Sequence, residues 1–463
     1  MLNALIAIGV RCSYLGCLTR YLGRLKPQQQ FSLMALLFEL DSPIKSLTCI
    51  FIAWKAFLFA IAIGSGVSPA YDTSSTLLSA SQASYHESAF DLATRLTRWD
   101  AIYYVQASRR GYVFEQEWAF ASGLPTVISF LTKALISFGV NQNETLEPLI
   151  GILVANVSHF LSALVLYKLG LTISKNSRMS LVAAILHILS PGGLFLSAPY
   201  SESPYSLLSF AGYLFFAKAV LSDRRAIAHN ASLIASGLWF GFAVNFRSNG
   251  TLNGILFAAE LLREISLSPT ANSIRRRLAL LIGGSAIAVG FVVPQAVAYR
   301  TYCYDMVDVE LRPWCTKPLP SIYTFVQEHY WNVGLLRYWT PANIPLFLLA
   351  GPMLYLMARS GSNFFFNPRI INEGPMSASV SKNLEALLRS MASTQLILIA
   401  LAVTTYHIQI ITRISSGYPL WYWWLANLLS RSETAGTGKN VVLFMIMYAS
   451  IQGALFASFL PPA

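Results

Sequence analysis

Residues Leu149–Gly170 read LIGILVANVSHFLSALVLYKLG and carry one charged side chain, Lys168. A transmembrane helix needs about 20 mainly apolar residues, so this run is long enough to cross a bilayer. In lipid the backbone polar groups must be satisfied within the segment, and the run is therefore expected to be helical. Runs of this kind recur along the chain. The sequence predicts an all-α, polytopic membrane protein.

The composition of the whole chain supports this class. The 463 residues are 55% hydrophobic and only 12% charged, whereas a soluble domain has about 25% charged residues. The net charge of +12 is more typical of membrane orientation and anionic lipid contact than of nucleic-acid binding. No basic-aromatic repeat argues for DNA or RNA, so no nucleic-acid partner is expected.

The apolar runs predict about eleven transmembrane helices in one helical bundle. The clear runs are 48–66, 149–170, 179–197, 204–221, 231–246, 278–299, 341–358, 390–411 and 441–460, and the two shorter ones are 251–262 and 418–430. We interpret residues 124–140, which contain Pro125 and Lys133, as an interfacial helix. Residues 1–40 form a basic N-terminal extension, and residues 41–463 form a single domain.

Basic residues concentrate in alternate short loops, which predicts that those loops face the cytosol. They hold Lys175, Arg178, Arg224, Arg225, Arg263, Arg275, Arg276, Arg277, Arg359, Arg369, Lys382, Arg389, Arg431 and Lys439. The opposite, lumenal or outer side then receives the long loop 67–148, the loop 300–340 and the turns 198–203, 247–250 and 412–417. Most acidic and aromatic candidates lie on that side.

The first long loop contains the most informative polar stretch, Arg98–Phe120, which reads RWDAIYYVQASRRGYVFEQEWAF. Its carboxylates Asp100, Glu115 and Glu117 lie among aromatic residues that include Tyr103. A carboxylate can take a proton from a hydroxyl, and aromatic rings stack on the apolar face of a sugar. The alternative is an amphipathic helix on the membrane surface with its charges in water.

Two turns on the same side add polar candidates. Glu202, in SAPYSES (197–203), either caps the next helix through the positive helix terminus or contacts substrate. Arg247 and Asn249 lie in NFRSNG between two apolar runs. Arg247 either snorkels at the bilayer edge or binds a lipid-linked phosphate through its forked guanidinium.

The loop from Glu310 to Trp339 and the end of the run 390–411 mix aromatic, amide and charged side chains. The candidates are Arg312, Trp314, Gln327, Trp331, Asn332, His407, Gln409 and Arg413. An aromatic belt or helix-helix hydrogen bonding is the alternative explanation. Metalloprotease, hydrolase and nucleotide-binding motifs are absent from the sequence, so neither a metal nor a cofactor is expected.

Two covalent features are predicted on the lumenal side. Cys303 and Cys315 lie in the loop 300–340, where an oxidising compartment would permit a disulfide, whereas Cys12, Cys17 and Cys49 are expected to stay reduced. Two free thiols remain the alternative. Asn143-Glu144-Thr145 is an N-glycosylation sequon in the first loop.

Several motifs together resemble the PIG-V type family, the GPI mannosyltransferase 2 enzymes of the endoplasmic reticulum. The resemblance runs from about Leu47 to the C-terminus. It is carried by AWK (53–55), YDTS (71–74), RWDAIYY (98–104), LSPGGLFLSAPYSESPYSLLSF (189–210), RSNG (247–250), RPWC (312–315) and HIQIITR (407–413). At Gly123 the sequence reads FASGLP, where the family commonly has a proline after the aromatic residue.

The resemblance implies a GT-C architecture with its active site on lumenal loops. It implies dolichol phosphate mannose as donor and an α1,6 transfer of the second mannose to a one-mannose GPI precursor in the endoplasmic reticulum membrane. The family's Trp-Asp pair falls on Trp99 and Asp100, and we assign the catalytic base to Asp100. Arg247 is the first choice for the leaving phosphate and Arg98 the second. A small accessory membrane subunit is left open.

Two other functions stay open from the sequence. One is another polyprenol-phosphate-sugar transferase of the same architecture, and the other is a multispan lipid or solute transporter. A transporter is expected to have inverted repeats and broken helices near mid-membrane. Here the ionisable groups gather at the loop ends instead.

Overall fold

The computed structural model describes residues 42–67, 70–72, 92–222, 227–266, 268–304, 311–368 and 378–460. All regular elements of this part of the chain are helices, as the sequence predicts, and it contains no strand. The basic extension 1–40 lies outside the described residues.

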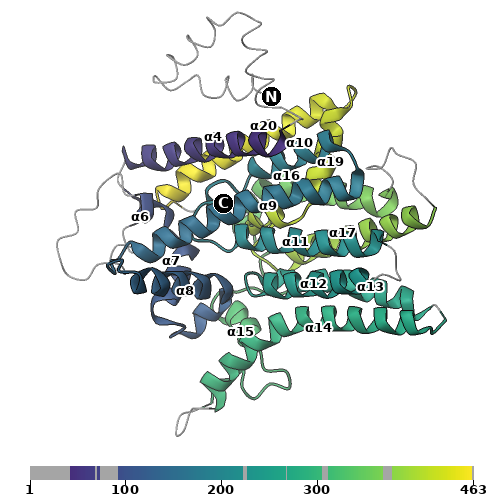
Figure 1. Cartoon of the computed structure of the whole chain (residues 1–463). Coiled ribbons are helices and arrows are strands. Elements are labelled where there is room, and N and C mark those ends of the chain that lie inside the picture. The colour runs from purple at the N-terminus through teal and green to yellow at the C-terminus, as the bar shows by residue number, and fades with distance from the viewer. Residues whose placement is uncertain are drawn as a thin grey trace, which may run out of the picture.

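Within the described residues, eight helices are long and apolar enough to cross a membrane (Figure 1). They are α4 (Pro43–Gly64), α9 (Leu146–Ser174), α11 (Glu202–Leu221), α12 (Ile227–Val244), α14 (Ala271–Tyr299), α16 (Ile344–Phe366), α17 (Ala378–Thr404) and α20 (Ala435–Ala457).

Three of the predicted spans contain helices that are shorter than the eight long ones. They are α10 (Ser177–Ile188), α13 (Gly254–Ile265) and α19 (Leu420–Ser430), of 12, 12 and 11 residues. At about 1.5 Å per residue, each of these helices alone is shorter than a hydrocarbon core about 30 Å thick, so the number of spans stays a prediction. The Pro191-Gly192-Gly193 turn follows α10 and leads into the 3₁₀ turn η3 (Gly193–Leu196), so the apolar run 179–197 is not one helix.

Helix α11 forms the middle of the bundle and is the most buried of the eight long helices. It packs against α9 on one side and α12 on the other, and α12 packs against α14. The α12–α14 contact is close: a Cβ atom added at Gly237 would lie 2.2 Å from Cα of Gly283. Glycine is therefore required for these two helices to approach. Helices α4 and α20 cover the opposite side of the bundle (Figure 1).

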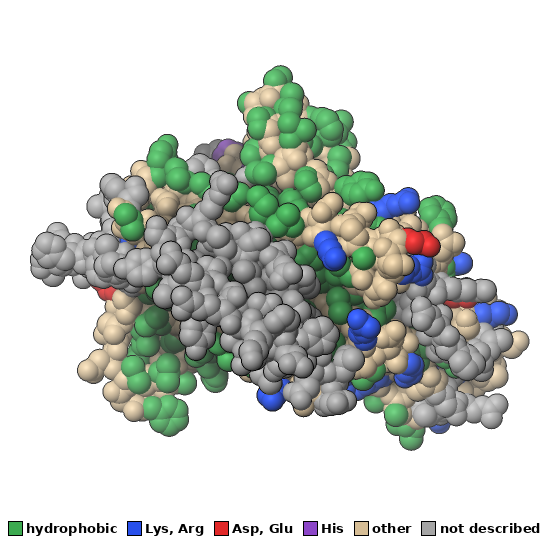
Figure 2. Space-filling view, turned by 90° about the horizontal axis from the view of Figure 1, so that it is seen from above, with side chains coloured by type: hydrophobic (Ala, Val, Ile, Leu, Met, Phe, Trp, Pro, Cys, Tyr) green, Lys and Arg blue, Asp and Glu red, His purple; other side chains and the backbone are tan. Residues whose placement is uncertain are grey.

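The loops predicted to be lumenal fold into short helices at one end of the bundle (Figure 1). They are α6 (Leu92–Leu96), α7 (Asp100–Arg110), η2 (Glu115–Ala119), α8 (Gly123–Ser137) and α15 (Ile322–His329). Figure 2 shows Lys and Arg side chains toward the other end. This separation agrees with the charge pattern of the sequence, and the orientation in the membrane stays a prediction.

A small second core holds the loop 300–340 together. Tyr302, Trp314, Ile322 and Val326 are buried in it. Cys303 and Cys315 are joined by a disulfide, with their Cα atoms 5.6 Å apart. The two cysteines that the sequence paired are thus bonded in the structure.

Candidate functional site

A pocket of about 400 Å³ opens at the end of the bundle that carries α7, α8 and α15. Seven separate segments line it, and all belong to or adjoin loops that the sequence places on one side. Many of the predicted site residues meet here: Trp99, Asp100, Arg247, Asn249, Gln327, Trp331, His407, Gln409 and Arg413. Residues more than 300 positions apart in the sequence are therefore neighbours.

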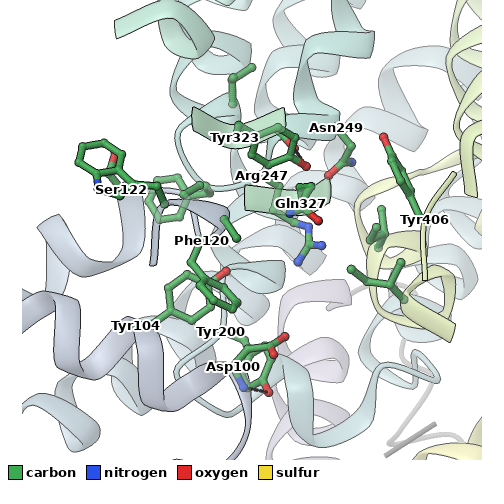
Figure 3. A pocket seen from close by; sticks show the side chains of 18 of the residues that line it. Asp100, Tyr104, Phe120, Ser122, Tyr200, Arg247, Asn249, Tyr323, Gln327 and Tyr406 are labelled. Carbon is green, nitrogen blue, oxygen red and sulfur yellow. Dashed lines mark hydrogen bonds between the residues drawn. The ribbon is translucent and has the colours of Figure 1, made fainter. Parts of the chain in front are cut away.

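Asp100 is the first residue of α7, and its carboxylate faces the pocket (Figure 3). The positive end of the helix favours an acid at this position. Oδ2 of Asp100 accepts a hydrogen bond from Nη1 of Arg413 at 2.9 Å, and the Asp100 side chain remains 35% exposed. This carboxylate is both oriented and reachable.

Glu202 lies behind the pocket wall and links two arginines. It is fully buried at the start of α11. Its Oε1 lies 2.6 Å from Nη1 of Arg247 and 3.7 Å from Nε of Arg413. Asp100, Arg413, Glu202 and Arg247 thus form a row of alternating charges. Glu202 is absent from the pocket lining, so it positions the arginines rather than contacting a ligand.

Arg413 is held between charge and aromatic rings. Its guanidinium lies 4.8 Å from the ring centre of Phe195 and 5.4 Å from that of Tyr200. Burial alone would lower its pKa, but the carboxylates of Asp100 and Glu202 raise it above the ordinary value. Arg413 therefore stays charged in this site.

Aromatic side chains form one wall of the pocket beside Asp100 (Figure 3). Phe120 and Trp331 line it, with their ring centres 6.2 Å apart and nearly perpendicular. Tyr103 supports this wall from outside the lining, stacked on Phe120 at 4.6 Å. Such a surface suits the apolar face of a sugar ring.

The wall beside Arg247 is built from α14, α15 and the turn before α13. The amide oxygen of Gln295 accepts a hydrogen bond from the backbone N–H of Tyr323 at 3.2 Å. The hydroxyl of Ser248 donates to that of Tyr323 at 2.9 Å. Figure 3 shows Arg247 extending from this side toward the side that holds Asp100. A ligand between them would touch both.

His407 and Gln409 contribute neutral polar groups. Nε2 of His407 lies 2.9 Å from the carbonyl oxygen of Trp331, and its ring stacks on Tyr338 at 4.8 Å. Burial, the largest effect, lowers the pKa of His407 below its ordinary value. The ring is therefore neutral at neutral pH, with Nε2 as the donor. Oε1 of Gln409 accepts from the Tyr338 hydroxyl at 2.9 Å.

The two glutamates of the first loop lie outside this pocket and hold loops together. Glu117 pairs with Arg110 and accepts from the backbone N–H groups of Val113 and Phe114, at 2.8 and 3.1 Å. Both glutamates are buried, at 5% exposure for Glu115 and 2% for Glu117. Their expected role in substrate binding is not supported by their position.

Glu115 fastens the second loop to the first. Its oxygens accept from Nε1 of Trp314 at 3.0 Å and from the Tyr330 hydroxyl at 3.3 Å, and Nε of Arg312 lies 3.4 Å away. Neither Trp314 nor Arg312 lines the pocket. Arg312 and Trp314 were candidates for the site, but their contacts with Glu115 attach the second loop to the first instead.

Two other predicted contacts also lie elsewhere. Arg98 is fully buried, with its guanidinium 4.9 Å from the ring centre of Phe459, so it is not placed to bind a pocket phosphate. Asn332 is exposed and has a φ of 50°, which is typical of a turn. The sequon residue Asn143 is exposed between α8 and α9, whereas Asn249, in a second sequon, is 6% exposed.

Sequence reasoning missed several residues of this site. Tyr200, Gln295 and Tyr323 line the pocket, but none was a candidate. Gln295 offered a signal, because an amide beside Pro294 in an apolar run is unusual. Tyr200 lies two residues before Glu202 in the stretch that drew attention to the acid. Among the described residues no group of three His, Cys, Asp or Glu side chains could hold a metal ion, and the expectation of metal-free chemistry stays a prediction.

A family model described as Mannosyltransferase (PIG-V) matches residues 44–463. The protein named GPI mannosyltransferase 2 from Chaetomium globosum is 50% identical over 456 residues, covering 91% of this chain and 96% of that protein. Its namesake from Gibberella zeae is 44% identical, covering 93% and 100%. Among solved structures, the oligosaccharyltransferase AglB of Archaeoglobus fulgidus is 11% identical, with a TM-score of 0.45, over 89% of this chain and 56% of that one.

Proposed function

Because the chain belongs to the PIG-V mannosyltransferase family, we propose that it adds the second mannose of the GPI anchor. The donor is dolichol phosphate mannose, the acceptor is a one-mannose GPI lipid precursor and the new bond is α1,6. The enzyme is a multi-pass GT-C transferase of the endoplasmic reticulum membrane with its pocket on the lumenal side. The family match over residues 44–463 carries this proposal.

Asp100 acts as the general base of a single inverting displacement. An acceptor hydroxyl attacks the anomeric carbon, its proton passes to the Asp100 carboxylate, and the bond from that carbon to the phosphate oxygen breaks. The electron pair leaves with dolichyl phosphate. Asp100 is supported in this role by its pocket exposure and by the Arg413 contact that orients it. General base catalysis typically contributes about 10²–10⁴-fold.

Arg247 receives the negative charge of the departing phosphate. It lines the pocket, only 13% of its side chain is exposed, and its guanidinium keeps further N–H donors beside the Glu202 contact. A forked guanidinium matches phosphate oxygens, and a preorganised cation stabilises charge that develops in the transition state. Arg413 replaces Arg98 as the second phosphate candidate, because Arg98 is buried away from the pocket.

The remaining pocket residues bind the sugars. Trp99, Phe120 and Trp331 offer ring surfaces, and Gln327, His407 and Gln409 offer hydrogen-bonding groups. Glu202 keeps the two arginines apart at a fixed spacing. No step of this mechanism requires a metal ion or an organic cofactor.

Microsomes that contain the protein, labelled dolichol phosphate mannose and a one-mannose GPI lipid test this function. We expect a two-mannose product whose label is released by an α1,6-specific mannosidase, and undiminished transfer in the presence of EDTA. A chain that ignores this donor but uses another polyprenol-phosphate sugar belongs to the alternative transferase class. Translocation of lipid without transfer indicates a transporter.

A further inference from the structure

The hydroxyl of Tyr200 bridges the two peptide groups on either side of Trp99. It donates to the carbonyl oxygen of Arg98 at 3.3 Å and accepts from the N–H of Asp100 at 3.1 Å. Tyr200 is 1% exposed. Burial, followed by the Asp100 carboxylate, raises its pKa well above the ordinary value, so the hydroxyl keeps the proton that it donates.

Trp99 needs such support because its backbone is strained. Its φ is 56° and its ψ is −128°, a conformation that bulky residues rarely adopt and that persists only where the surroundings impose it. Trp99 also precedes the first turn of α7, whose N–H groups lack intrahelical acceptors. An indole cannot accept a hydrogen bond in the way that Ser or Asp does at this position. Tyr200 supplies that acceptor for Asp100.

A second aromatic residue supports the same junction from the C-terminal segment. The ring of Phe459 meets the Trp99 ring edge-on, with centres 5.1 Å apart, and lies 4.9 Å from the Arg98 guanidinium. Phe459 is 4% exposed although it follows the last helix. It therefore limits movement of the Trp99 ring.

Tyr200 is itself fixed on both sides. Nζ of Lys55, a buried residue of α4, donates to the carbonyl of Leu196 at 3.1 Å and to Oγ of Ser197 at 2.7 Å. On the other side, the hydroxyl groups of Ser201 and Tyr104 lie 3.0 Å apart. The segment that carries Tyr200 is thus attached to the bundle and to α7.

We propose that Tyr200 is a positioning residue, whose hydroxyl holds the strained Trp99 junction and thereby sets the direction of the Asp100 carboxylate, with Phe459 supporting the Trp99 ring. This inference rests on the proposed role of Asp100 as base. It assigns the catalytic geometry to a hydroxyl that does not itself take part in the chemistry.

Tyr200→Phe removes only the hydroxyl and is the decisive variant. Because a misplacement of about 1 Å can cost about 10² in rate, we expect kcat to fall at least about tenfold while KM for dolichol phosphate mannose stays within about twofold. The matched control is Tyr213→Phe, since the Tyr213 hydroxyl is also buried and donates to Asn253 at 2.6 Å, away from the pocket. The control should lose similar thermal stability and keep its kcat.

A Tyr200→Phe protein with normal kcat, or equal kcat losses in the two variants, overturns the proposal. Substitution of Phe459 is an independent test. Phe459→Ala should lower kcat, whereas Phe459→Tyr, which keeps the ring, should have a kcat close to that of the wild type. If Asp100→Asn retains full transfer, the proposed base has failed. If Asp100→Asn is inactive but Tyr200→Phe is not, the positioning role alone has failed.

Discussion

Arg413 binds the carboxylate of Asp100 through Nη1 at 2.9 Å. The same guanidinium reaches Glu202, which holds Arg247, so the proposed base and the proposed phosphate ligand are mechanically linked. A phosphate that binds Arg247 or Arg413 changes the electrostatic environment of Asp100. Donor binding and base orientation are therefore expected to depend on one another.

Asp100→Asn should reduce mannose transfer by about 10²–10⁴-fold, because an amide cannot accept the acceptor's proton. The variant should still be made and inserted in the membrane, since asparagine has nearly the same shape. Initial rates in microsomes with equal protein amounts provide the measurement. Glu328→Gln is the control: it changes an exposed carboxylate, paired with Arg337 at 2.7 Å, in the second loop. Near-normal transfer by Asp100→Asn would remove the base assignment.

Arg247→Ala should both destabilise the protein and raise KM for the donor. Breaking a buried ion pair costs up to about 3–5 kcal/mol, and the fully buried Glu202 would keep only its longer contact with Arg413, at 3.7 Å. The stability and the donor KM of Arg247→Lys should lie between those of the wild type and Arg247→Ala, since lysine keeps the positive charge but loses the forked guanidinium.

The double variant Arg247→Ala/Glu202→Gln separates the two effects of Arg247. Removing both charges should recover much of the thermal stability, whereas KM for the donor should stay high because no guanidinium replaces Arg247. The wild type, Arg247→Ala, Glu202→Gln and the double variant form a double-mutant cycle, in which the thermal stability and the KM for the donor of each protein are measured. Recovery of donor KM along with stability would show that Arg247 is structural only.

Much of the fold was predictable because hydropathy and loop charge act over whole segments. The number of spans stays a prediction at α10, α13 and α19, where an apolar run indicates burial but not the length of one helix. A run that is buried by neighbouring helices and a run that crosses lipid have the same composition. The Pro191-Gly192-Gly193 turn was visible in the sequence, but its effect on the span 179–197 was underestimated.

The pocket was predictable where a polar residue ends an apolar run, as at Arg247 and Arg413. The pocket was not predictable where the role of a residue depends on which side chain contacts it in the folded protein. Glu115 and Asp100 are both acids in the same aromatic stretch, yet Trp314 covers one and the pocket exposes the other. Tyr200 was not a candidate, because no pattern in the sequence reports a contact between residues 100 positions apart.

His407 should make stability depend on pH. Burial lowers its folded pKa below the unfolded value of about 6.5, so below that pH the unfolded chain binds a proton that the folded chain does not. This contribution to stability is present above about pH 6.5 and is lost as the pH falls toward the folded pKa. As the pH is lowered from 8 to 5, the melting temperature of His407→Gln should fall less steeply than that of the wild type. Parallel curves would show that His407 does not titrate in this way.

The orientation of the chain is tested by glycosylation of Asn143. Its side chain is exposed in the turn between α8 and α9, whereas Asn249 is buried by hydrogen bonds to Tyr205 and Tyr418 at 3.0 and 3.1 Å. We expect a glycosidase-sensitive mobility shift that disappears in Asn143→Gln and persists in Asn249→Gln. Cleavage within residues 92–120 by a protease added outside sealed microsomes would instead place this loop in the cytosol.

The disulfide between Cys303 and Cys315 should stabilise the second loop. Its sequence separation of 12 residues corresponds to a loop-closure contribution of roughly 3 kcal/mol on the chain-entropy estimate. We expect Cys303→Ser/Cys315→Ser to lower the melting temperature and reduce kcat modestly, because this loop leads into α15, which carries Tyr323 and Gln327 into the pocket. Mass spectrometry after alkylation without reduction should label Cys49 but neither Cys303 nor Cys315. A labelled Cys315 in fully active protein would leave the buried Trp314 contact with Glu115 as the main attachment of the loop.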